Sequence, residues 1–155
     1  MGRIDKRLAE LGIVLPTPSK PVANYVPWVR TGNLVFISGQ GALKDGKLEF
    51  TGKVGDTLST EDAIASARLT AVNVIAHLRD ACGGDLDRVK RIVKLLGFVN
   101  CTPAFGDQPK VINGGSDLFV AVFGDAGRHA RSAVGMGSLP GNITVEIEAI
   151  LQVDG

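Results

Sequence analysis

The sequence predicts a mixed α/β (α+β) fold, in which helices pack on one face of a mixed, mostly antiparallel β-sheet. Apolar residues recur at helical spacing in three segments, and runs rich in β-branched residues lie between and after them. The chain has 155 residues, a length typical of one domain with one hydrophobic core. We therefore expect one domain over residues 1–155, with a helix and an extended arm over residues 1–24.

The N-terminal segment is expected to be a short amphipathic helix over residues 3–12. Its apolar residues Ile4, Leu8 and Leu11 have helical spacing, and Gly12 ends the pattern. Four prolines then fall between positions 16 and 27. Because proline fixes its own backbone and disfavours helix in the residue before it, this stretch is expected to be extended.

The next segments predict a strand, a hairpin and a long helix. Residues 33–38 form a dense β-branched and aromatic run, which favours a buried strand. Asp45-Gly46 is typical of a hairpin turn. Ser59 or Thr60 is placed to cap a helix, which an apolar stripe continues until Gly83-Gly84.

Four further elements complete the predicted fold. Residues 89–100 favour a second long strand, and residues 110–123 a second helix despite Gly114 and Gly115. Residues 131–136 and 143–153 favour two final strands. In the last one apolar and acidic side chains alternate, which predicts one buried and one open face.

Charge and composition argue against several classes of protein. Seventeen basic residues face sixteen acidic ones, for a formal charge of +1, whereas nucleic-acid binders usually carry a basic surface. No apolar run is long enough for a bilayer, and the N-terminus lacks the apolar region of a signal peptide. Two cysteines and two histidines do not have metal-site spacing. We expect a cytoplasmic protein without a metal, a nucleic-acid partner or a membrane contact.

Candidate chemistry gathers near the C-terminus. Arg131 begins a strand and offers the rigid fork that suits a carboxylate. Glu146 and Glu148 share one face of the following strand, where carboxylates could orient a water molecule or hold a proton. Spacing alone leaves the plainer alternatives open: Arg131 could pair with a glutamate, and the two glutamates could line a solvated sheet face. His129 is expected at a surface or interface, with tuning of a pocket as the alternative.

The C-terminal segment resembles a known family. Arg131-Ser-Ala-Val, Leu139-Pro140 and Val145-Glu-Ile-Glu-Ala149 look like the signature of the RidA/YjgF superfamily, some of whose members are described as endoribonucleases. Tyr25, Ser38-Gly-Gln40 and Asn113 match upstream features in the same order. The likeness extends from about Tyr25 to Val153.

This resemblance implies a chorismate-mutase-like (bacillus) fold and a homotrimer with ligand sites at the subunit interfaces. Family members hydrolyse 2-imino or enamine acids to 2-keto acids and ammonia without a cofactor. By resemblance, Arg131 would bind the substrate carboxylate and Glu146 would position the attacking water. Tyr25, Ser38, Asn113 and the residue at Ala133 would line the substrate pocket, and the partners would be a small imino or keto acid and further copies of the chain.

The sequence also departs from the family pattern. Ala133 stands where many members have cysteine, so that position supplies no thiol. The N-terminal helix, the excursion over residues 44–60 and the Gly127-Arg-His-Ala-Arg131 approach resemble a longer branch of the superfamily. For that branch we keep two alternatives beside the deaminase: a non-catalytic metabolite-binding or regulatory trimer, and an endoribonuclease.

Overall fold

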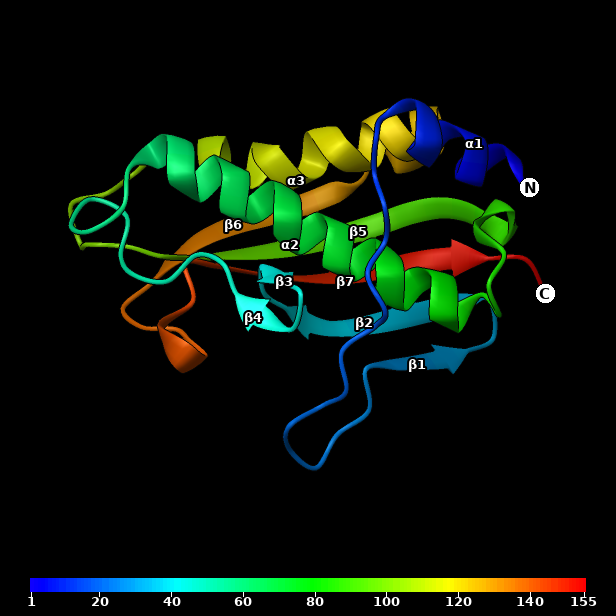
Figure 1. The fold of residues 1–155 in the computed structure, drawn as a ribbon, viewed down its shortest axis with the longest axis horizontal. Coiled ribbons are helices and arrows are strands. Elements are labelled where there is room, and N and C mark those ends of the chain that lie inside the picture. The colour runs from blue at the N-terminus through cyan, green and yellow to red at the C-terminus, as the bar shows by residue number, and fades with distance from the viewer.

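A five-stranded sheet forms the framework of the protein, as the computed structural model of residues 1–155 shows (Figure 1). The strands lie in the order β1-β2-β7-β5-β6. All neighbours are antiparallel except β5 and β6, which are parallel. The strands are β1 (Trp28–Thr31), β2 (Leu34–Gln40), β5 (Val89–Asn100), β6 (Ala130–Met136) and β7 (Val145–Val153). The predicted fold class is confirmed.

Two long helices cover one face of this sheet, side by side (Figure 1). They are α2 (Thr60–Ala81) and α3 (Gln108–Phe123), and the shorter α1 (Arg3–Glu10) lies against the end of α3. Ser59 caps α2, because its hydroxyl accepts a hydrogen bond from the Asp62 N–H at 3.1 Å. None of these helices combines the length and the apolar character needed to cross a bilayer.

Short elements connect these parts. The predicted turn at Asp45-Gly46 joins β3 (Leu43–Lys44) and β4 (Lys47–Leu48), and both turn residues have positive φ. Three 3-10 turns precede strands or lie between them: η1 (Leu86–Arg88), η2 (Gly124–Gly127) and η3 (Pro140–Asn142). The N-terminal arm crosses α2 between α1 and β1 (Figure 1), where the Ser19 hydroxyl and His77 Nε2 lie 3.3 Å apart.

The faces of the sheet differ as the alternation in β7 predicts. Its buried side chains point toward α2 and α3, whereas Glu146 and Glu148 point away from them. The face without helices carries both polar and apolar side chains, and four of its large apolar side chains are 37–52% exposed: Val29, Leu34, Phe36 and Val134. This chain therefore leaves one face of the sheet uncovered.

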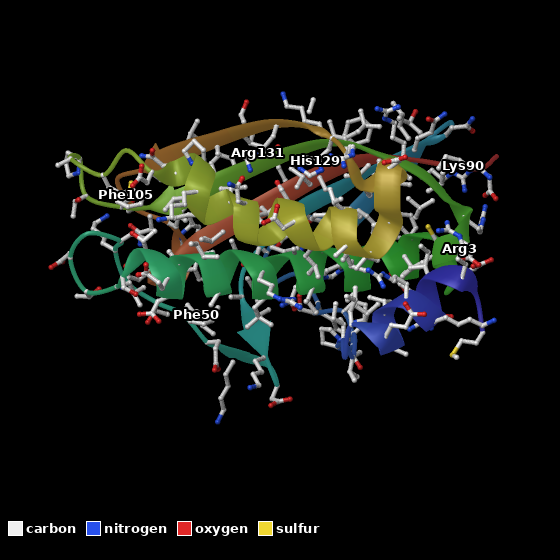
Figure 2. The ribbon with its side chains drawn as sticks, turned by 90° about the horizontal axis from the view of Figure 1, so that it is seen from above. Arg3, Phe50, Lys90, Phe105, His129 and Arg131 are labelled. Carbon is white, nitrogen blue, oxygen red and sulfur yellow. The ribbon has the colours of Figure 1, made fainter.

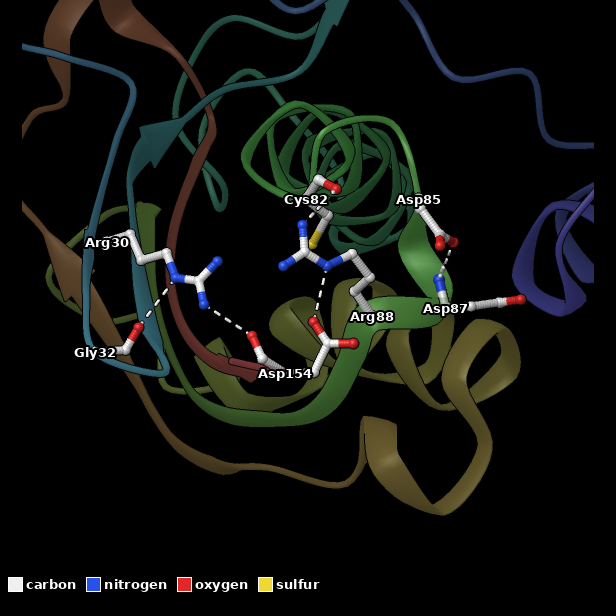
Figure 3. Close-up of polar contacts among 7 residues, drawn as sticks. All are labelled: Arg30, Gly32, Cys82, Asp85, Asp87, Arg88 and Asp154. Carbon is white, nitrogen blue, oxygen red and sulfur yellow. Dashed lines mark hydrogen bonds and ion pairs between the residues drawn. The ribbon is translucent and has the colours of Figure 1, made fainter.

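The end of the sheet near the C-terminus is closed by polar contacts around Asp154 (Figure 3). Arg88 Nε donates to the Asp154 carboxylate at 2.8 Å, and Arg30 donates to the Asp154 carbonyl at 2.8 Å. The Arg88 side chain also donates to the Cys82 carbonyl, and so joins η1 to the end of β7.

Some element boundaries differ from those predicted. The strand β1 was missed, because four residues between Pro27 and a turn are too few to show a pattern. The last strand begins at Val145, two residues later than predicted, because Ile143 closes the η3 turn. The α1 helix ends at Glu10, and the chain turns at Gly12 with φ 67°.

Two glycines that weaken the helix prediction for α3 have a packing role. A Cβ built on Gly114 would lie 2.3 Å from the Ile64 carbonyl oxygen of α2, and one on Gly115 would crowd the Ala67 carbonyl at 3.3 Å. A backbone oxygen cannot turn aside as a flexible side chain can. The absence of side chains therefore sets how closely α3 approaches α2.

We predict that Gly114→Ala destabilises the fold by about 1–3 kcal/mol, because the overpacking outweighs the better helix propensity of alanine. Denaturant unfolding measures the change. Gly106→Ala is the matched control, since a Cβ there meets nothing within 4 Å. Equal stability of the two variants would contradict the close-packing role of Gly114.

Candidate functional site

Arg131 lies on β6, at the edge of the sheet, and faces the helices. It pairs with Leu95 of β5, which is fully buried beneath them. From there its guanidinium reaches α3, where Nη1 donates to Asn113 Oδ1 at 2.7 Å and to Ser116 Oγ at 3.1 Å. Nη2 donates to the Pro109 carbonyl at 3.4 Å.

These contacts leave one edge of the Arg131 guanidinium uncommitted. Both hydrogens of Nη1 are used, whereas Nε–H and one hydrogen of Nη2 make no bond within the chain. Nε and Nη2 form the fork that binds a carboxylate with two parallel hydrogen bonds. Arg131 belongs to none of the four ion pairs of the chain. Within one chain, therefore, Arg131 does not pair with a glutamate.

A histidine, His129, lies close to Arg131 and beside α3 (Figure 2). His129 Nε2 lies 2.9 Å from Ser116 Oγ, and its Nδ1 lies 2.6 Å from the Gly127 carbonyl oxygen. Burial lowers the pKa of His129; the Gly127 contact opposes this, and the charge of Arg131 adds to it. The His129 ring is thus held neutral next to the guanidinium.

A second group of predicted residues lines a cavity of about 460 Å³ between the arm, β2, η3 and β7. Tyr25, Ser38 and Glu146 are among its lining residues. The Ser38 hydroxyl donates to the Val26 carbonyl at 2.7 Å, and the Ser38 N–H donates to the Pro27 carbonyl at 2.9 Å. Ser38 therefore fixes the end of the arm that carries Tyr25.

Gly39 makes room for the carboxyl group of Glu146. A Cβ on Gly39 would lie 2.0 Å from Glu146 Oε1, so any other residue there would force the Glu146 carboxyl group out of its position. The register between β2 and β7 shifts between Ile37 and Gln40, so Gly39 lies at an irregularity of the ladder. This explains physically why glycine follows Ser38 in the motif.

The environment of Glu146 favours its neutral form. Burial raises the pKa of the half-buried Glu146 carboxyl, and the negative charge of Glu148 on the same face raises it further. A carboxyl whose pKa moves toward neutral pH is better suited to exchange protons with a substrate.

The two groups of residues lie on opposite faces of the sheet. Arg131 pairs with Leu95, whereas Glu146 pairs with Phe98, three residues further along β5. Because side chains alternate along a strand, an odd separation places them on opposite faces. One chain thus carries Arg131 and Asn113, with Ala133 on the same side of β6, apart from Tyr25, Ser38 and Glu146.

Comparison with known proteins identifies the family. The model of the family described as "YjgF/chorismate mutase-like, putative endoribonuclease" matches residues 5–148. The chain belongs to the YjgF/RidA family. It is 44% identical to protein TCP17 of Trypanosoma cruzi over 154 residues, which cover 99% of this chain and 96% of that protein. The crystal structure of Atu1372 from Agrobacterium tumefaciens is 48% identical, covers 97% of this chain and 92% of that one, and superposes with a TM-score of 0.92.

A more distant member of the YjgF/RidA family has an activity in its name. The 2-iminobutanoate/2-iminopropanoate deaminase of Dermatophagoides farinae is 28% identical over 143 residues, which cover 92% of this chain and 95% of that protein.

Two features of the candidate site were not assigned to it from the sequence. One is Gly39, and the other is the pair Ser116 and His129, which lies behind Arg131. Ser116 follows Asn113 by three residues on a predicted helix, a spacing that places both side chains on one face and could have indicated it.

We predict that Glu148→Gln lowers the pKa of Glu146 part of the way toward its ordinary value, because one negative charge is removed while burial remains. A carboxyl-detected NMR titration of Glu146 measures the change. Glu61→Gln, at an exposed position of α2, is the control and should leave that titration unaltered. An unchanged Glu146 titration in Glu148→Gln would contradict the coupling of the two carboxyl groups.

Proposed function

We propose that this protein is a cofactor-independent hydrolase that converts reactive 2-imino acids, or their enamine tautomers, into 2-keto acids and ammonia. The observation that carries the proposal is the uncommitted Nε–Nη2 edge of Arg131, a cation that three neutral acceptors hold without a carboxylate partner. A small metabolite with a carboxylate supplies that partner. The deaminase name of a relative at 28% identity supports the choice of reaction.

The proposal requires that two subunits share each site. Arg131 of one chain and Glu146 of another face the same ligand, since within one chain they lie on opposite faces of the sheet. The uncovered sheet face, with its exposed apolar side chains, and the exposed arm near Tyr25 offer the surfaces on which copies pack. We take the assembly to be a homotrimer, as the family resemblance implies.

The reaction needs little from the protein beyond placement. The Arg131 fork binds the substrate carboxylate and so fixes the imine carbon. Ionised Glu146 takes a proton from the water that attacks this carbon and passes it to the imine nitrogen, so that the C=N bond becomes a C–N single bond and a carbinolamine forms. Glu146 then takes the proton of the new hydroxyl group and gives it to the nitrogen; the C–N bond breaks, ammonia leaves, and the C=O bond forms. One imino acid and one water give one keto acid and one ammonia, and Glu146 ends in its starting state.

We predict that Arg131→Lys lowers kcat/KM for freshly generated 2-iminobutanoate by about 10²-fold, because a lysine cannot reproduce the planar fork. Keto-acid release measures the rate. Arg128→Lys is the matched control, since Arg128 is an exposed neighbour that pairs only with Asp125. Equal rates in the two variants would remove the role of Arg131.

We predict that Glu146→Gln lowers the rate by about 10²–10⁴-fold, the usual contribution of a general base, without loss of thermal stability. The sign follows from the raised pKa: ionised Glu146 opposes folding as pH rises through that pKa, so a neutral glutamine stabilises the fold at neutral pH. Thermal unfolding beside the rate assay checks both parts. A folded, fully active variant would contradict the role of Glu146.

We predict that two inactive variants restore activity when their subunits are mixed. In a trimer of Arg131→Ala and Glu146→Gln chains, some interfaces combine an intact Arg131 with an intact Glu146 from the other chain. Random assortment at equal amounts makes about one quarter of the interfaces intact. Unfolding, mixing and refolding followed by the deaminase assay tests this, and activity that stays at background would contradict a shared site.

The two alternatives are outcomes of these assays. Clear binding of a keto acid at Arg131 with no turnover of any imine would favour the non-catalytic, regulatory trimer. RNA cleavage has less support, because the two histidines that could serve as acid and base already have other contacts. His77 is 1% exposed and lies against Ser19, and His129 faces Ser116 and Gly127.

A further inference from the structure

We propose that Ser116 and His129 are positioning residues that hold Arg131 in its carboxylate-binding orientation, and that they do so only while the His129 ring is neutral. The inference rests on the proposed function, because it concerns how the arginine of that site keeps one edge free. Neither Ser116 nor His129 touches the ligand, and both act on it only through Arg131.

The hydrogen bonds of this group have one consistent direction. The Gly127 carbonyl can only accept, so the close contact at 2.6 Å places the ring hydrogen on His129 Nδ1. Nε2 then carries a lone pair and accepts the Ser116 hydroxyl hydrogen at 2.9 Å. With its hydrogen so directed, Ser116 Oγ presents its lone pairs to Arg131 Nη1 at 3.1 Å.

The His129 ring is fixed on more than one side, so its orientation is not free to adapt. Its edge packs against the Phe119 ring, with the centroids 6.1 Å apart and the planes at 74°. Gly127 is itself pressed against α3, where a Cβ would lie 2.3 Å from the Phe119 carbonyl oxygen. Ser116 and Phe119 are three residues apart on that helix. The same rigid helix therefore holds the ring and the hydroxyl group that it orients.

Protonation of His129 would reverse one bond of this series. A hydrogen on Nε2 would point at Ser116 Oγ, the atom that accepts from Arg131, and the serine hydrogen would lose its acceptor. Ser116 Oγ would then face two cationic donors, whose positive charges repel each other. The group that faces His129 from β6 is the charged Arg131, whereas α3 presents the uncharged Ser116 and Phe119, and η2 the Gly127 carbonyl.

The expected pH dependence follows from these contacts. Because the pKa of His129 lies below its usual 6.5, the ring is neutral at neutral pH and Arg131 is held. As pH falls through that pKa, the contact with Ser116 weakens and the affinity for a carboxylate falls. A merely structural histidine would not transmit its titration to Arg131.

The first test is made on the full-length, ligand-free protein by NMR of the Arg131 guanidinium. Separate Nη1 and Nη2 signals report restricted rotation, and we expect them in the native protein at neutral pH. We expect the signals to merge in Ser116→Ala and in His129→Phe, which keeps a ring against Phe119 but removes both nitrogens. Ser116→Thr keeps the hydroxyl group and should retain the separate signals. Restricted rotation that persists in His129→Phe would overturn the inference.

The second test measures the binding of 2-oxobutanoate by calorimetry between neutral pH and about pH 5. Ser116→Ala and His129→Phe should weaken binding about tenfold, the usual effect of one hydrogen bond to a charged group. The native protein should lose affinity toward acid, and His129→Phe should lack that part of the profile. Because Glu146 titrates in both proteins, the difference between their profiles isolates His129.

The outcomes separate this inference from the proposed function. Merged signals in both variants, with no keto-acid binding by the native protein, would support the positioning role and reject the ligand. Keto-acid binding that is the same in native protein and His129→Phe, at every pH, would reject the positioning role and leave Arg131 as the carboxylate site. Tighter binding toward acid in the native protein would also overturn the inference, because it would mean that the added charge outweighs the lost contact.

Discussion

The pairing of β7 with β5 on one side and β2 on the other determines where the functional groups of this chain lie. Each strand presents alternate residues to the helices and to the uncovered face. That single alternation buries Ile147 and Ala149 beneath α2 and α3 and turns Glu146 and Glu148 away from them. It also places Arg131, across β5, on the helix side of the sheet. The core of the protein and the separation of its candidate site therefore have one cause.

The chain carries an arginine fork on one face of the sheet and a carboxyl with a raised pKa on the other. Under the proposed function, each of these groups is half of a site, and a second copy of the chain supplies the other half. Neighbouring residues determine the position of both groups. Asn113, Ser116 and Pro109 accept hydrogen bonds from Arg131, and the space at Gly39 admits the Glu146 carboxyl. Such support suits a reaction in which the protein mainly positions its reactants.

Much of the fold could be predicted from local patterns. Residues 89–100 form a strand with the predicted bounds, and the alternation in the last strand gave its buried face correctly. The strand β1 was missed because four residues are too few to show the alternation of apolar and polar side chains that indicates a strand. What local patterns cannot contain is the order of strands, and the opposite faces of Arg131 and Glu146 follow from β5 lying between β6 and β7. The motifs identified both residues, but only their registers show that one chain does not bring them together. The role of Gly39 likewise depends on a distance to a residue more than a hundred positions away.

The most direct test of a carboxylate site shared between subunits is a crystal structure of the protein with 2-oxobutanoate bound. We expect the ligand carboxylate to lie on the Nε–Nη2 edge of Arg131, with the ligand carbonyl carbon facing Glu146 of a neighbouring subunit. A ligand that binds away from Arg131, or an assembly in which Glu146 of every neighbour is remote from that edge, would contradict it.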